Sequence, residues 1–293
     1  MKFRIGAIAL VAVLLFLIPT RTVWCEGEER PASEAEKAFY RRVFETVAAA
    51  VPACGPPGWA VAEKTEYEKL DAVAVGTEKE PFWTSYTIAW QNNAALQAAD
   101  AAMTAERARI LARAEGVPPE TAKRLEKLAA AVATAADQGD WPSVRRAQEE
   151  IDAIAERIDS GSGQFDSEQE EALLCHEARD ARAEITIMVN VMVESFMDPF
   201  AETDPVAGHP VFRTDGDLDP DYGWQEGVSF VFLGPGWQLS GEGEEAFMEA
   251  LPGVGLPHTR VQTVLVRVQA EEERARTLLE GLNWKALEGL IGT

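Results

Sequence analysis

The sequence has few of the residues that carry catalysis in common enzyme families. It contains three histidines, His176, His209 and His258, and none belongs to a His-x-x-x-His pair. A Gly-x-Ser-x-Gly nucleophile elbow, a phosphate-binding glycine loop and a Gly-x-Gly-x-x-Gly dinucleotide fingerprint are also absent from the sequence. These absences remove the sequence signatures of many hydrolases and of nucleotide-dependent enzymes. We therefore assign no catalytic residue from the sequence and favour a protein that is not an enzyme.

Cysteine is equally scarce, with only Cys25, Cys54 and Cys175 in the chain. Their spacing relative to the histidines does not match a zinc site. If Cys25 leaves with the N-terminal leader described below, an even pair remains, and such a pair often forms a disulfide in an oxidising compartment. We predict a disulfide between Cys54 and Cys175. The alternative is two separate buried thiols, since free cysteine packs as a small apolar residue.

Positive charge is sparse as well. The chain has 27 Lys and Arg residues against 49 Asp and Glu residues, which gives a formal net charge of -22. A protein this acidic is repelled by nucleic-acid phosphates and by anionic lipid surfaces, so we expect neither as a partner. The acidity is compatible with cation binding and with a surface that is simply solvated, and we favour the second interpretation.

Long apolar runs are limited to one, at the N-terminus. Lys2 and Arg4 precede the apolar stretch 5–18, an arrangement typical of a secretory signal. We predict that residues 1–25 are a signal peptide, cleaved after Cys25, and that the chain is exported to the periplasm or secreted. The apolar stretch is shorter than the about 20 residues of a membrane span, so we expect no transmembrane span in the mature chain.

Two alternatives to cleavage concern the same segment. Cys25 is a candidate for lipid anchoring, but the bulky Trp24 stands where such processing requires a small residue. An uncleaved membrane anchor is the other alternative, and the short apolar stretch argues against it.

The remaining sequence contains clear helix and strand patterns. Residues 26–32 are polar and acidic, and we expect a flexible lead-in there. Ser33 and Glu36 form a capping box, which predicts a helix that begins at this point and stops at Pro52. The segment 198–210 is rich in turn residues. Apolar alternation and short apolar runs predict strands at 59–63, 72–75, 82–90, 180–195, 211–213, 227–233 and 259–268, followed by helices to the C-terminus.

A helical segment, 94–159, interrupts the strands. It is rich in alanine and charge, and breaks at 116–119 and 139–142 divide it into three helices. Apolar residues recur at alternating spacings of three and four, which is typical of a helix–helix seam of the coiled-coil kind. We favour helices packed on the sheet, because most apolar helix faces are core. The alternative is a projecting segment that binds a protein partner.

Strands, then helices, then strands indicate an α+β protein. We predict an antiparallel sheet of about four to six strands flanked by helices, with an Ala-rich helical hairpin or small bundle inserted in the middle. The predicted organisation is a signal peptide at 1–25, a lead-in at 26–32 and a single α+β domain at 33–293, with the helical insertion at 94–159.

The sharpest local signal is a run of alternating acids. Calcium prefers six to eight oxygen ligands, and several carboxylates on one turn can supply them. The stretch resembles an EF-hand loop, but Pro220 occupies the place that requires glycine and the flanks read as strands, so it does not fit that motif. The candidate metal ligands are Asp215, Asp217, Asp219, Asp221 and Glu226. No cofactor is implied by the rest of the sequence, and the alternative for this stretch is a solvated acidic turn.

Tryptophans lie near the ends of several predicted strands. They suit a ligand-binding groove, although such residues more often pack in a core. The candidates are Trp59, Trp83, Trp90, Trp224 and Trp237. Together these features predict an exported soluble protein that is a non-catalytic binding or envelope-associated module. The alternative is a carboxylate-dependent hydrolase that acts outside the cytoplasm, since an acidic chain offers many candidate acid pairs.

Overall fold

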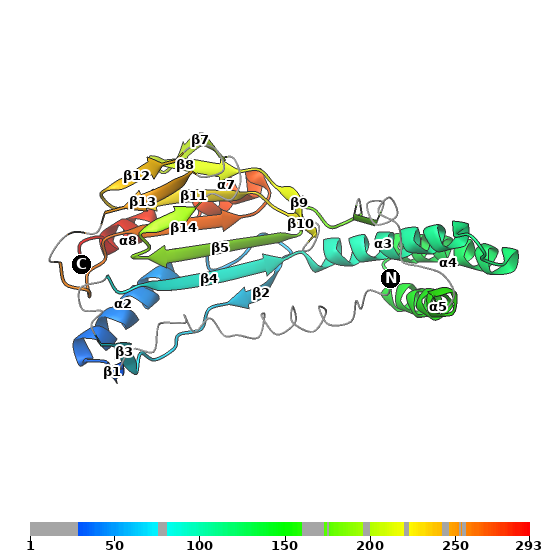
Figure 1. The fold of residues 1–293 in the computed structure, drawn as a ribbon, viewed down its shortest axis with the longest axis horizontal. Coiled ribbons are helices and arrows are strands. Elements are labelled where there is room, and N and C mark those ends of the chain that lie inside the picture. The colour runs from blue at the N-terminus through cyan, green and yellow to red at the C-terminus, as the bar shows by residue number, and fades with distance from the viewer. Residues whose placement is uncertain are drawn as a thin grey trace, which may run out of the picture.

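The centre of the fold is a seven-stranded antiparallel sheet with the strand order β2-β4-β5-β14-β11-β8-β7 (Figure 1). The computed structural model describes residues 29–75, 81–159, 173–174, 176–195, 200–219, 223–241, 246–251, 253 and 256–293. The strands of the large sheet are β2 (Ala60–Lys64), β4 (Thr84–Gln91), β5 (Arg182–Val189), β7 (Phe200–Val206), β8 (His209–Thr214), β11 (Val228–Leu233) and β14 (Val264–Gln269).

Three small sheets accompany the large one. The first contains three strands, β6 (Val193–Ser195), β12 (Trp237–Ser240) and β13 (Phe247–Ala250). The others are two-stranded, one of β1 (Glu29–Pro31) with β3 (Ala72–Ala74) and one of β9 (Asp217–Asp219) with β10 (Gly223–Gln225). The predicted α+β class with an antiparallel sheet is confirmed, although the large sheet has seven strands instead of four to six. Residues 29–31 of the expected lead-in form a strand.

Three helices pack on one face of the large sheet: α2 (Glu34–Ala50), α7 (Glu272–Glu280) and α8 (Trp284–Leu290) (Figure 1). The alternation along β4 explains this packing, because Tyr86, Ile88 and Trp90 are buried beneath the helices while the residues between them are half-buried. Val43 and Val47 of α2 complete the same core. The predicted helix at the capping box is confirmed as α2.

The three-stranded sheet packs against the opposite face. Phe230 of β11, Leu265 of β14 and Met248 of β13 are buried between the two sheets. Other positions on this face of the large sheet are polar, and Thr87 and Thr186 are joined there by a 3.0 Å hydrogen bond between their hydroxyls. One face of the large sheet is therefore mainly apolar, with a few polar residues such as Thr84 and Ser229, whereas the other is apolar only in part.

Asn190 divides the strand that the sequence predicts at 180–195 into β5 and β6. Its backbone is left-handed, with a φ of 61°. The side-chain oxygen accepts from the backbone nitrogen of Gln262 at 2.7 Å, and the amide nitrogen donates to the carbonyls of Phe82 and Arg260. Because these bonds replace the sheet ladder, the chain turns here, and Val193 of β6 is 53% exposed instead of buried.

The turn-rich segment 198–210 contains a strand, β7, that the sequence analysis misses. A tight turn at Ala207 and Gly208, with φ values of 52° and 88°, joins β7 to β8. Pro205 lies where the register between the two strands shifts. Proline is tolerated at such an irregularity on an edge strand, because it has no N–H to donate to a ladder.

The helical segment forms three helices, α3 (Asn93–Arg113), α4 (Pro119–Asp137) and α5 (Trp141–Asp159), with the predicted breaks between them. We call these helices the arm, and the remaining described residues the body. The arm has its own core, which contains Leu125, Val132 and Ile151 and no residue of the body. It projects beyond the sheet as a continuation of β4 (Figure 1). The expectation that these helices pack on the sheet is therefore wrong, because the helices bury their apolar faces against one another.

The arm occupies the connection between two neighbouring strands. β4 and β5 pair over their whole length, with Gln91 opposite Arg182, so the arm leaves the sheet and returns to it at adjacent points. Its first helix spans about 31 Å at 1.5 Å per residue. Of the helices in the described part of the chain, none is both long enough and apolar enough to cross a bilayer.

Candidate functional site

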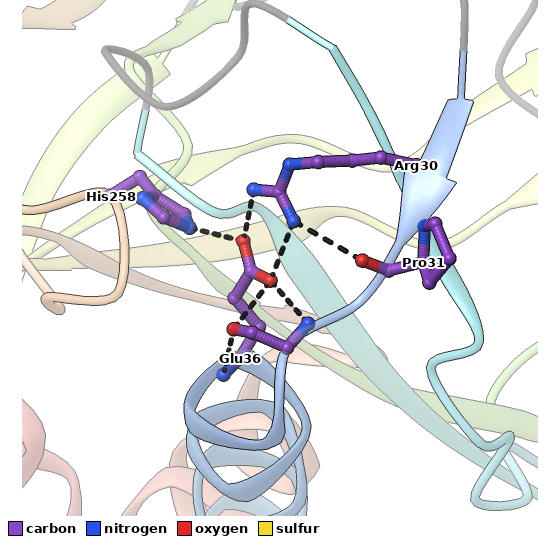
Figure 2. Close-up of polar contacts among 5 residues, drawn as sticks. Arg30, Pro31, Glu36 and His258 are labelled. Atoms are coloured by element: carbon purple, nitrogen blue, oxygen red, sulfur yellow. Dashed lines mark hydrogen bonds and ion pairs between the residues drawn. The ribbon is translucent and has the colours of Figure 1, made fainter.

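Among the described residues, the most buried carboxylate with ionic partners is Glu36, on the first turn of α2 (Figure 2). Its side chain is 3% exposed, and the guanidinium of Arg30 donates to its two oxygens at 2.7 and 3.0 Å. The backbone nitrogen and the hydroxyl of Ser33 donate to Oε2 at 2.7 Å each, and Nε2 of His258 lies 2.8 Å from Oε1. Two segments distant in sequence, residues 30–36 and the segment around His258, thus meet at one carboxylate.

Arg30 holds the pKa of the Glu36 carboxyl far below its ordinary value. The hydrogen bonds from Ser33 and His258 lower this pKa further, while burial opposes the shift. Glu36 is therefore ionised throughout the physiological pH range. A buried carboxylate without such donors would instead remain protonated.

The arrangement around Glu36 fits an anchor better than a catalytic acid or base. Five contacts occupy its two oxygens, which leaves little capacity to exchange a proton with a substrate. The hydroxyl of Ser33 donates to Glu36 and not to His258, so the histidine does not act as its base. The contacts tie β1, α2 and the segment before β14 together.

A second cluster lies where the arm joins the body. We call it the root cluster, and it consists of Trp59, Glu177, Arg179, Asp180, Trp224, Glu226 and Arg274. Arg274 of α7 donates to both carboxylate oxygens of Asp180, at 2.6 and 2.7 Å, and its guanidinium lies 4.4 Å from the ring centroid of Trp59. The backbone nitrogen of Asp180 donates to Glu226 at 2.6 Å.

The same cluster holds the residues before Asp180. The guanidinium of Arg179 lies over the indole of Trp224 at 4.2 Å, and the backbone nitrogen of Trp224 donates to Glu177. The pKa of Arg274 is raised, chiefly by the hydrogen bond to Asp180. Desolvation opposes that shift, whereas the nearby carboxylates add to it. The segment 177–180, which precedes β5, therefore has contacts with α7, with β10 and with Glu226, the residue after β10.

The five predicted tryptophans occupy different surroundings. Trp59 and Trp224 belong to the root cluster, and Trp90 is fully buried beneath the helices of the body. Trp237 packs between the two sheets, where its indole donates to the carbonyl of Leu233 at 3.0 Å. Trp83 is 46% exposed. The interpretation of these residues as core packing applies to Trp90 and Trp237, and a role in ligand binding stays a prediction for the others.

The predicted calcium ligands lie on the hairpin of β9 and β10. Asp217 accepts from the neighbouring backbone nitrogen of Leu218, and Glu226 accepts from Asp180. Asp221 and the side chain of Asp219 lie outside the described residues. Within the part of the chain that the structure describes, no group of three or more acidic, histidine or cysteine side chains converges as a metal site would. Calcium binding at Asp215 and its neighbours stays a prediction.

The predicted disulfide is also untested. Cys54 lies as an exposed free thiol in the turn before β2. Cys175 lies outside the described residues.

Two open hollows are present on the surface. One of about 210 Å³ lies between α3 and α4 and is lined by Arg109, Arg113, Glu126 and Ala130. The other, of about 490 Å³, runs along the outer face of α2, where Arg41 and Glu45 contribute to it. Each contains a single carboxylate among its lining residues, and glycoside hydrolysis by the usual mechanisms requires a pair. Neither hollow therefore supports the hydrolase alternative.

Glu194 of β6 is a carboxylate whose pKa is shifted in the opposite direction from that of Glu36. Burial raises its pKa, and Arg267 of β14, 3.5 Å away, opposes the shift. The guanidinium of Arg267 lies 5.6 Å from the ring centroid of Phe230. Glu194 thus lies between the two sheets, with Arg267 as the cationic partner that the structure shows.

The sequence identifies some of these residues and misses others for a definable reason. The capping box locates Ser33 and Glu36, because both partners lie within one helical turn. The contributions of Arg274 and His258 depend on segments far apart in the chain, which no local pattern connects.

Comparison with known proteins adds no identification. A scan against protein-family models found no matching family, and searches of curated proteins and of solved structures found no significant match. A functional hypothesis for this chain must therefore come from its own residues.

Proposed function

We propose that the chain is a non-catalytic binding protein that works outside the cytoplasm and engages a protein partner through its arm. The observation that carries this proposal is the arm itself. Its core is complete without the body, and the strands on either side of it are already adjacent in the sheet. A short turn would connect them equally well, so the arm contributes surface and reach instead of stability to the body.

The distribution of charge favours the arm as the contact surface. Residues 93–159 contain nine Lys and Arg residues and twelve Asp and Glu residues, so the arm is close to neutral in a chain of net charge -22. The rest of the chain carries nearly all of that negative charge. A strongly acidic surface repels other acidic proteins. A partner therefore approaches the nearly neutral arm at lower electrostatic cost than it approaches the rest of the chain.

The N-terminal sequence supports work outside the cytoplasm. The N-terminus begins with positive residues, continues with an apolar stretch and ends with a short segment before Glu26, as secretory signals do. N-terminal sequencing of the native protein is expected to begin at Glu26. A native protein that still begins at Met1 would contradict this part of the proposal, and a lipidated Cys25 would replace it with membrane anchoring.

Site-specific photo-crosslinking in the native host tests the arm. A photoreactive residue is placed at Lys127 or Ala131 on the exposed side of α4, and a matched one at Glu63 on the exposed edge strand β2. We expect a discrete cross-linked species from the arm positions and none from β2. Adducts confined to Glu63, or no adduct from either arm position, would contradict the proposal.

A second variant separates the arm from the body. Replacing residues 94–172 with a glycine- and serine-rich linker keeps Asn92 and the root cluster. The shortened protein is expected to retain a cooperative thermal transition and to no longer co-purify, through an affinity tag, with the partner that the arm cross-links identify. If it stays folded and still captures the same partner through the body, the arm is not the binding surface.

A further inference from the structure

The hollow on the outer face of α2 contains charges of both signs that do not pair with each other. Its lining consists of Arg41, Arg42, Glu45, Thr46 and three alanines, Ala38, Ala49 and Ala286. Glu45 follows the two arginines by four and three positions, the spacing at which opposite charges on a helix usually meet. None of the ion pairs in the described part of the chain includes these three charged residues. On the same helix, Lys37 and Glu34 do pair, at 2.8 Å.

Each of the two guanidiniums contacts an aromatic side chain instead of a carboxylate. Arg41 donates to the hydroxyl of Tyr67, whose ring packs against that of Phe44 with the centroids 5.3 Å apart. The guanidinium of Arg42 lies 5.6 Å from the ring centroid of Phe39. A ligand that binds these guanidiniums therefore meets side chains that are already positioned, which lowers the entropy cost of binding.

The rest of the lining is small and mostly apolar. The methyl groups of the three alanines come from both α2 and α8, and Thr46 is the only uncharged polar residue of the lining. The volume of about 490 Å³ lies within the range of pockets for small molecules, which combine apolar surface with a few polar groups. The hollow thus offers apolar surface beside two positive charges and one negative charge.

We infer that this hollow binds a small zwitterion with an apolar side chain, a free amino acid or a short peptide. Arg42, together with Arg41, receives the carboxylate of the ligand, because a guanidinium can donate two parallel hydrogen bonds to it. Glu45 accepts from the ammonium group of the ligand. The apolar side chain of the ligand lies on the alanines.

The charge of the protein favours a zwitterion over a simple ion. An anion would meet Glu45 in the hollow and a chain of net charge -22 around it, and a cation would meet the two guanidiniums. A zwitterion carries no net charge, so the acidity of the chain does not oppose its approach. This inference goes beyond the proposed function, and its test does not involve the arm.

Binding is measured on the full chain by saturation-transfer difference NMR, with L-leucine and the dipeptide Leu-Leu as probes. N-acetyl-leucine, which lacks the ammonium group, and leucinamide, which lacks the carboxylate, test each charge of the ligand. Arg42→Gln and Glu45→Gln test each charge of the protein, and both positions are exposed on a helix that glutamine suits. Arg276→Gln and Glu280→Gln are the matched controls, because these residues form an exposed pair on α7.

We expect saturable binding of leucine, of Leu-Leu or of both, and the tighter probe distinguishes an amino acid from a peptide as the ligand. Each blocked analogue and each of the two α2 variants is expected to weaken binding about two- to fivefold, the effect of one exposed ion pair, while the controls leave it unchanged. The inference would be overturned if neither probe binds at millimolar concentration or if N-acetyl-leucine binds as tightly as leucine. An unchanged affinity in either α2 variant, with its fold verified by circular dichroism, would overturn it as well.

Discussion

Replacement of Glu36 by glutamine tests the anchor of β1 most directly. The substitution keeps the size of the side chain but removes the charge, and it brings an NH₂ group against the donors of Arg30 and Ser33. Removing one partner of a buried ion pair costs about 3 to 5 kcal/mol. Because the side chain of Arg30 is 32% exposed and can reach water, we take the lower end, about 3 kcal/mol.

Thermal unfolding measures this loss. For a chain of this size, 3 kcal/mol corresponds to a melting temperature lower by roughly 6 to 9 °C. Glu34→Gln is the control, because Glu34 lies in the same helical turn with its side chain 90% exposed and is expected to change the melting temperature little. A Glu36→Gln protein that melts within about 1 °C of the parent would refute the reasoning.

The stabilisation that the ion pair of Glu36 and Arg30 provides depends on pH in a direction that follows from the pKa of Glu36. The folded state lowers the pKa of Glu36 below its ordinary value of 4.5. The stabilisation is therefore complete above that pH and is lost as the pH falls toward the lowered pKa. The gap in melting temperature between the parent and Glu36→Gln is expected to be widest near neutral pH and to narrow below about pH 4.5. A gap that widens in acid would contradict this account.

Four further outcomes are expected. Gly55→Ala places a Cβ 2.2 Å from the indole of Trp90 and should destabilise the protein by about 1 to 3 kcal/mol in chemical denaturation, whereas Gly289→Ala, with open space around it, should not. Because burial raises the pKa of Glu194, Glu194→Gln should gain stability relative to the parent as the pH rises from about 4 to 7, and a loss would contradict the burial argument. Non-reducing mass spectrometry should find the predicted disulfide, and two free thiols would exclude it. Calcium at millimolar concentration should raise the melting temperature if the predicted acidic loop binds it, and an unchanged value would exclude that site.

Local patterns in the sequence predict much of the fold. The capping box at Ser33, the alternation along 82–90 and the glycine breaks in the helical segment each depend on residues a few positions apart. The structure places α2, β4 and the three arm helices accordingly. The division of the strand at Asn190 is harder to foresee, because the apolar alternation continues past it and only the left-handed preference of asparagine indicates a turn.

The candidate sites could be predicted only in part. An apolar seam shows that a helix packs, but not which surface covers it, so the arm and a sheet-packed helix look alike in the sequence. Likewise, a charged residue such as Arg274 shows no local sign that its partner lies 94 positions away. Long-range polar pairs of this kind form only in the tertiary structure, and they produce no periodic pattern in the sequence.

The position of the arm between two paired strands also bears on how the chain folds. Residues 91 and 182 must meet before β4 and β5 can pair. Closing the loop between them costs about 4 kcal/mol in chain entropy. Helical bundles assemble from local contacts and form quickly. An arm that collapses first converts most of that loop into a compact object and shortens the search between its ends. We expect the inserted helices to aid the folding of the sheet that they interrupt, although their core is separate from its core.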